Sequence, residues 1–157
     1  DFYKPTGGVD LREGELLTKF FIPKKAYDGY YGAHFKYAMR NAMDVDVAGC
    51  STNVKLSPDK KKIEDVRIAF GVMGPCPVRA KNAEEAVKGK EINEKLSILF
   101  ADEAIKNLSP RTDYRATADF RSHISHVMAE RTLKEAVALA RGDVLPKEGG
   151  TCSGDTI

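Results

Sequence analysis

The first half of the chain holds three runs in which apolar residues cluster or alternate as they do in β-strands. These runs are residues 15–25 (ELLTKFFIPKK), 45–56 (VDVAGCSTNVKL) and 63–74 (IEDVRIAFGVMG). Pro58 and Asp59 favour a hairpin turn between the second run and the third. Residues 26–34 hold two glycines among aromatic and histidine side chains, and we expect them to form an ordered loop.

Apolar residues recur every three to four positions in the second half, which predicts helices. The expected helices are residues 82–89, 92–108 and 117–140. Asn82 is the expected N-cap of the first helix, and Gly89 its end. Pro110 prevents the second from continuing, and Gly142 ends the third. Strands followed by helices favour an α+β fold, in which a small antiparallel sheet of three to four strands and three helices form a two-layer sandwich.

Composition is that of one globular domain. Of the 157 residues, 42% are hydrophobic and 31% are charged, which excludes a wholly disordered chain. The net charge of +2 gives no electrostatic reason to expect nucleic acid or an anionic membrane as a partner. No apolar run approaches the roughly 18 residues that span a bilayer, so a cytoplasmic protein is expected. We expect residues 1–142 to form the domain and the Gly-rich residues 143–157 a flexible tail.

No complete catalytic constellation is visible in the sequence. His123 and His126 are three positions apart on the last predicted helix and could hold a metal, although no third ligand is evident; His34 is a candidate general base. The cysteines are widely spaced, lack zinc-ligand spacing and are expected to be reduced thiols. They are Cys50, Cys76 and Cys152.

Three charged residues stand at equal spacing immediately before the strand at 45–56: Lys36, Arg40 and Asp44. Whether this stretch is helical or extended, such spacing places them on one face. One interpretation is a surface ion pair that contributes roughly 0 to 1 kcal/mol. The other is a polar site, in which Asp44 holds Arg40 while Lys36 projects to polarise a carbonyl or to counter an anionic ring. Spacing alone leaves both open.

Four stretches, taken in order, carry a more specific signal. They are LREGELLTKFFIP (11–23), FKYAMRNAMDVDVAGC (35–50), VRIAFGVMGPCPVRAKNAEEAVKGK (66–90) and DYRATADFRSHISHVMAERTLKEA (113–136). Together they resemble the C-terminal domain of the FAD-binding (medium) subunit of molybdenum hydroxylases, a family that includes xanthine dehydrogenase, carbon monoxide dehydrogenase and nicotinate dehydrogenase. The resemblance covers roughly residues 2–140, and at Arg121 and Ser122 the last stretch departs from the commonest family form.

The resemblance implies a redox function. The family passes electrons from a substrate oxidised at a molybdenum cofactor, through [2Fe-2S] centres, to FAD and usually on to NAD. Its C-terminal domain covers one side of the flavin. Lys36 would approach the isoalloxazine edge, where a positive charge stabilises reduced, anionic flavin, and Arg40 and Asp44 would fix the loop that carries it. Structural roles are expected for three further arginines, Arg79, Arg121 and Arg131.

The family's N-terminal FAD-binding domain, with its Gly-rich loops, has no counterpart in this sequence. The resemblance therefore implies an isolated C-terminal domain, whether an expression fragment, a proteolytic product or the product of a split gene. Its partners would be the FAD-binding domain, a molybdenum-binding large subunit and an iron–sulfur small subunit, and the isolated chain would be colourless and inactive. The substrate (purine, nicotinate, aromatic acyl-CoA or CO), the final acceptor and the oligomeric state stay open.

Two alternatives accompany this interpretation. The first is a non-catalytic module that mediates only subunit assembly in the same kind of complex. The second is an unrelated small enzyme with a metal at His123 and His126.

Overall fold

The computed structural model describes residues 2–4, 7–40 and 42–143. Its strands are β1 (Tyr3–Lys4), β2 (Gly8–Val9), β3 (Tyr31–Tyr37), β4 (Ala48–Leu56), β5 (Ile63–Gly71) and β6 (Val78–Arg79), and its helices are α1 (Lys81–Val87), α2 (Glu94–Ile105) and α3 (Ala118–Arg141). A short 3₁₀ helix, Lys24–Ala26, precedes β3. Cys152 and all but the first residue of the predicted tail lie outside the described residues.

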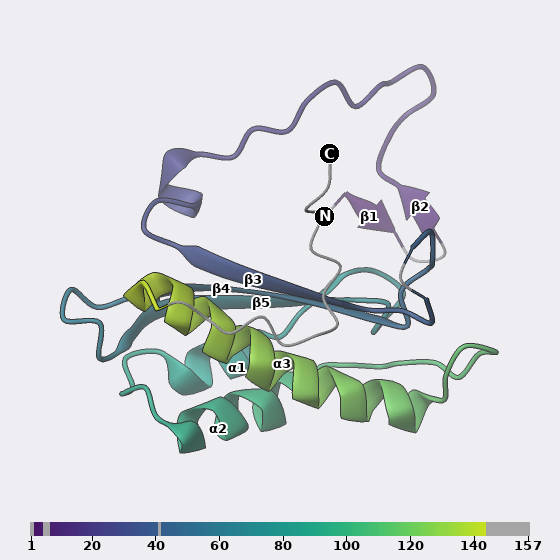
Figure 1. The fold of residues 1–157 in the computed structure, drawn as a ribbon. Helices are drawn as coiled ribbons and strands as arrows, with labels where there is room; N and C mark the ends of the chain where they lie inside the picture. Colours follow the sequence, from purple (N-terminus) through teal and green to yellow (C-terminus); the bar gives the residue numbers. More distant parts are fainter. Residues whose placement is uncertain (1, 5–6, 41, 144–157) are drawn as a thin grey trace.

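Strands β3, β4, β5 and β6 form one antiparallel sheet in that order. β3 pairs with β4 along its whole length, with Tyr31 opposite Val54 and Tyr37 opposite Ala48. Figure 1 shows the three helices covering one face of this sheet. The arrangement confirms the predicted α+β sandwich, to which β1 and β2 add a separate two-stranded sheet. None of the helices in the described ranges combines the length and the apolar character that a bilayer span requires.

The core lies between the sheet and the helices, because alternate residues of each long strand face the helical layer. Its large, fully buried members include Ile63, Val66, Ile68, Phe70, Phe100 and Met128. Two threonines lie within it, and the Thr52 and Thr132 hydroxyl oxygens are 2.8 Å apart. Thr132 also donates to the Met128 carbonyl at 2.8 Å, so both buried hydroxyls are hydrogen-bonded. Burial raises the pKa of the neighbouring Cys50 thiol to about 11, which keeps it protonated.

The helix boundaries follow from their capping residues. The side chain of Asn93 accepts from the Leu96 N–H at 2.9 Å, and Thr117 caps α3 in the same way. Gly142 ends α3 in the left-handed conformation, with φ of 85°, as predicted. The predicted N-cap of α1 is wrong: Ala80 holds that position, and Asn82 lies inside the helix, where its amide donates to a carbonyl of α2.

Two predictions for the N-terminal part are also wrong. Residues 15–25, expected as the first strand, pair with no strand in the described part of the chain. The first long strand is β3, and its residues 31–34 belong to the segment that the sequence predicts as a loop. The loop prediction failed because Gly32 and the aromatic residues suggested a turn, whereas β3 is an edge strand that tolerates a glycine.

Two of the arginines have the structural roles that were predicted. Arg121 is completely buried, and its guanidinium donates to the Asp113 carboxylate at 2.8 Å and to the Arg111 carbonyl at 2.9 Å. This holds residues 109–117 against the start of α3. Arg79 makes two hydrogen bonds to the Glu84 carboxylate, at 2.7 and 2.8 Å, which join β6 to α1.

Candidate functional site at the β3–β4 loop

The three charged residues singled out in the sequence lie at one end of the sheet. β3 carries Lys36, and the loop that leads into β4, described at residues 38–40 and 42–47, carries Arg40 and Asp44. A hydrogen bond of 2.8 Å from the Val47 N–H to the Tyr37 carbonyl closes the base of this loop. Tyr37 itself packs against the ring of Phe120 on α3, so its side chain faces the helices. By alternation, Lys36 faces the side of the sheet that the helices leave open.

Asp44 organises the loop through the backbone. One carboxylate oxygen accepts the N–H groups of Met39 at 2.8 Å and Arg40 at 3.1 Å, and the other accepts the Val45 N–H at 2.8 Å. Desolvation raises the pKa of the Asp44 carboxyl, but the three N–H donors outweigh it. The pKa therefore lies below its ordinary value of 3.8, and the group is a carboxylate at neutral pH.

Lys36 is held on two sides. Its ammonium donates to the Asp44 backbone carbonyl at 2.8 Å and forms an ion pair of 3.0 Å with the Asp46 carboxylate. The space for that carboxylate comes from Gly49, since a Cβ at this position would stand 3.1 Å from an Asp46 oxygen. The Lys36 side chain nevertheless stays 46% exposed. An ammonium has three N–H donors, so one remains after these two contacts.

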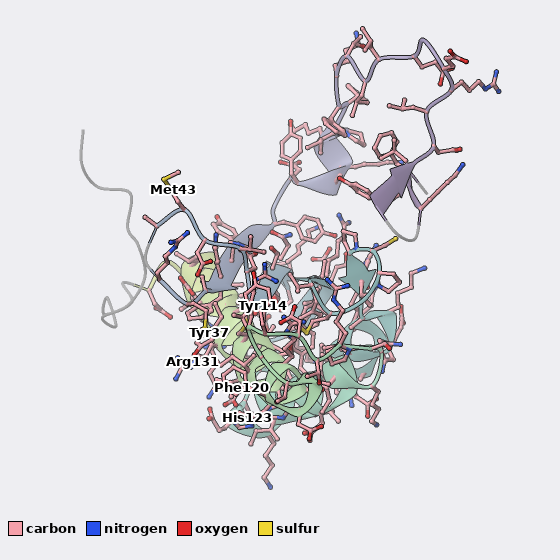
Figure 2. The ribbon with its side chains drawn as sticks, turned by 90° about the vertical axis from the view of Figure 1, so that its right-hand side faces the viewer. Tyr37, Met43, Tyr114, Phe120, His123 and Arg131 are labelled. Atoms are coloured by element: carbon pink, nitrogen blue, oxygen red, sulfur yellow. The ribbon has the colours of Figure 1, made fainter. Side chains whose placement is uncertain are left out.

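Arg40 acts at the tip of the loop. Its guanidinium donates to the Met43 carbonyl at 2.6 Å. Met43 has a positive φ of 49°, a strained conformation for a residue with a side chain, and its own side chain is 96% exposed. Figure 2 shows Met43 at the outer edge of the loop, away from the body of the domain.

The structure thus brings Lys36, Arg40 and Asp44 together, but it places Lys36 on β3 and not in the loop, and it alters the expected contacts. Asp44 does hold Arg40, through its backbone N–H and not through its guanidinium. Lys36 is tied to the loop and does not project freely. The sequence interpretation missed Asp46, although the pattern Asp-Val-Asp already places both carboxylates on the same side of an extended chain.

The other candidates are separate from this loop. His126 lies 2.9 Å from an Asp102 oxygen, and His123 is exposed on the same helix, as is Arg131 (Figure 2). Over the described ranges no group of three His, Cys, Asp or Glu side chains has the geometry to hold a metal, so the two histidines find no third ligand there. The His34 ring lies 2.7 Å from the Ser51 hydroxyl on the open face of the sheet.

The Asp44 contacts lead to a test of loop order. We expect Asp44→Ala to speed hydrogen exchange of the Met39 and Arg40 amides about tenfold at neutral pH, because both lose their acceptor. In the wild type this protection should be complete above the unfolded-state pKa and should be lost as the pH falls through the lowered folded-state pKa. The measurement is residue-resolved exchange by NMR.

Asp59→Ala is the matched control, because Asp59 accepts the Lys61 N–H in the turn between β4 and β5. It should leave the Met39 and Arg40 amides unchanged. Equal exchange rates at these amides in Asp44→Ala and in the wild type would contradict the role assigned to the carboxylate.

Together, the fold and this loop define a class of small α+β domain that presents a polar, cation-bearing loop at one end of its sheet. The sequence model described as the CO dehydrogenase flavoprotein C-terminal domain matches residues 33–136. The chain belongs to this family, the C-terminal domain of the FAD subunit of molybdenum hydroxylases, which confirms the resemblance seen in the sequence.

Individual relatives agree with the family. The xanthine dehydrogenase FAD-binding subunit of Escherichia coli O157:H7 is 34% identical over 141 residues, which are 90% of this chain and 48% of the relative. The glyceraldehyde dehydrogenase medium chain of Sulfolobus acidocaldarius is 30% identical over 86% of this chain and 46% of its own length. The chain therefore spans about half the length of these curated relatives.

Solved structures show the same fold. Carbon monoxide dehydrogenase from Hydrogenophaga pseudoflava superposes with a TM-score of 0.75 at 28% identity, over 87% of this chain and 46% of that one. Quinoline 2-oxidoreductase from Pseudomonas putida 86 gives a TM-score of 0.78 at 25% identity, over 89% of this chain and 47% of that one.

Proposed function

We propose that this domain covers the flavin in the FAD subunit of a xanthine dehydrogenase-like molybdenum hydroxylase, with Lys36 facing the flavin ring. The domain would help to pass electrons from molybdenum and [2Fe-2S] centres through FAD to NAD. Family membership supports the flavoprotein context. The observation that carries the residue assignment is the half-exposed Lys36 side chain, whose ammonium is fixed by two contacts and left with one N–H donor.

The loop residues fit an acceptor-rich aromatic ring. When bound, FAD supplies the two-electron chemistry, and a positive charge beside its ring favours the reduced, anionic form. Lys36 would provide this charge and a hydrogen bond. Asp44 would hold the loop backbone, and Arg40 would fix the turn at Met43, so that the ammonium does not have to be ordered when the ring binds.

The proposal divides the cofactors among several units. Most contacts to FAD would come from the half of the subunit that this chain does not match in its relatives. The molybdenum cofactor and the [2Fe-2S] centres would lie in large and small partner subunits, in line with relatives named as medium chains and medium subunits. A cytoplasmic location is part of the same proposal.

The test is Lys36→Met in the assembled, FAD-loaded enzyme. We expect the flavin midpoint potential to fall by about 30 mV, since roughly 1.4 kcal/mol of stabilisation of the reduced form corresponds to that shift for two electrons. Reduction of the flavin by the substrate should slow accordingly. Redox titration followed by flavin absorbance measures the potential.

Lys55→Met is the matched control, because Lys55 is also a lysine of this sheet with one ion pair, at 2.7 Å to Glu64, away from the loop. It should leave the potential unchanged. If Lys36→Met also leaves both potential and rate unchanged, the assembly-only function takes precedence. The exposed apolar side chains of residues 16–22 are the observation that favours it.

A further inference from the structure

Residues 15–22, which we call the arm, expose most of their apolar surface. Four of its large apolar side chains are mostly exposed to solvent: Leu16 (85%), Phe20 (78%), Phe21 (87%) and Ile22 (66%). Figures 1 and 2 show the arm standing clear of both the sheet and the helices. Large apolar side chains clustered in one exposed segment are characteristic of a surface that a partner covers.

The backbone of the arm is also unpaired. Within the described ranges, no backbone hydrogen bond joins residues 16–22 to any other part of the chain. The composition is nevertheless that of a strand, with Leu16, Thr18, Phe20 and Ile22 sharing one face in an extended conformation, and Pro23 ends it. A segment that has strand composition, an apolar face and free N–H and C=O groups is suited to pairing with the edge of another sheet.

The base of the arm is fixed. Arg67 on β5 donates to the Ala26 carbonyl at 3.0 Å and to the Tyr30 hydroxyl at 2.8 Å, and its guanidinium stacks 4.4 Å from the centre of the Tyr30 ring. The Tyr30 hydroxyl in turn donates to Asp65. These contacts anchor residues 26–30 to the sheet, so the arm leaves the domain in a defined direction.

We infer that residues 15–22 add as a β-strand to a sheet of the flavin-binding half of the subunit. The relatives are about twice as long as the region they share with this chain, and the family match begins at residue 33, after the arm. In those relatives this domain is joined to a further stretch of chain of about equal length, and that stretch is the neighbour that would cover the arm. The inference rests on the proposed function in taking that neighbour to be the flavin-binding half.

The face that would enter the partner's core is the one without a charged residue, with Leu16, Phe20 and Ile22. Lys19 and Phe21 lie on the opposite face. Phe20→Ser and Lys19→Ser therefore form a matched pair of substitutions, one on each face. Thr18→Pro and Thr18→Ala form a second pair, because proline removes a backbone N–H that a paired strand needs and alanine keeps it.

The experiment uses this chain and the flavin-binding half from the same genome, produced with FAD as a separate polypeptide. Isothermal titration calorimetry should show binding by the wild type. Phe20→Ser should raise the Kd about 30-fold and Thr18→Pro at least about tenfold. Lys19→Ser and Thr18→Ala should stay within about threefold of wild type. Hydrogen exchange should show amides of residues 16–22 protected only in the complex.

Folding and docking are separable, because the arm supplies no core residue. All four variants should therefore unfold in urea like the wild-type chain. Absence of wild-type binding, or equal Kd values for Phe20→Ser and Lys19→Ser, would overturn the inference. So would a dimer of this chain alone that Phe20→Ser dissociates, since the occupant would then be a second copy.

Different results would contradict the flavin role of Lys36 and the docking of the arm. If arm variants abolish binding but Lys36→Met leaves the flavin potential unchanged, docking by the arm stands and the flavin role of Lys36 is wrong. If the potential shifts but arm variants bind normally, the flavin role stands and strand addition is wrong.

Discussion

Arg121→Ala is expected to lower the free energy of unfolding by about 3 kcal/mol, one of the two largest effects of any single substitution proposed for this chain. The guanidinium is fully buried and makes charge-assisted hydrogen bonds to Asp113 and to the Arg111 carbonyl. Its removal leaves both acceptors without that donor and opens space at the start of α3. Urea unfolding of the isolated chain measures the change.

Arg131→Ala is the control on the same helix, because its side chain is exposed and its loss should change stability by less than about 0.5 kcal/mol. The carboxylate partner provides a pH test. The N–H of Arg115 and the guanidinium of Arg121 lower the pKa of Asp113 to about 2. Its stabilising contribution is complete above the unfolded-state pKa and is lost as the pH falls from about 4 towards 2.

Arg121→Ala should therefore have a shallower acid-induced loss of stability than the wild type, because Asp113 no longer carries so low a pKa. Parallel acid profiles in the two proteins would show that the Arg121–Asp113 contact does not contribute to folding.

Phe70→Ala should be at least as damaging, with an expected loss of about 3 to 5 kcal/mol. Phe70 is 1% exposed on β5, opposite Cys50 of β4, and truncation leaves a cavity between the sheet and the helices. Phe21→Ala is the same change in the 87% exposed arm and should cost less than about 0.5 kcal/mol. Similar costs at the two positions would contradict the placement of the core.

Local sequence signals were sufficient for the elements whose partners are close in the chain. β4 and β5 flank a turn with Pro58 and Asp59, and α3 carries both its cap at Thr117 and its end at Gly142. The prediction of a strand at residues 15–25 failed, because strand composition does not show whether the segment pairs within this domain. The edge strand β3 was missed because its residues carry only a weak local strand signal. Its pairing with β4 makes it a strand.

The candidate site was located by spacing, but its contacts were not predictable. Lys36, near the end of β3, does meet the following loop, which carries Arg40 and Asp44. Which atoms they use depends on the backbone at Met43, whose positive φ turns its carbonyl towards the Arg40 guanidinium. The sequence around Met43 does not predict this positive φ, because methionine rarely adopts that conformation.

Side chains along β3 alternate between the helical side and the open side of the sheet, and this alternation limits insertions and deletions within the strand. Phe35 and Tyr37 pack towards the helices, while Lys36 points to the other side. One inserted residue upstream of Phe35 within the strand would exchange these sets, forcing an ammonium into the interior and two aromatic rings into water. Two inserted residues would restore the original facing. Natural variants of this strand should therefore gain or lose residues in pairs, or shift the change into the adjoining loop.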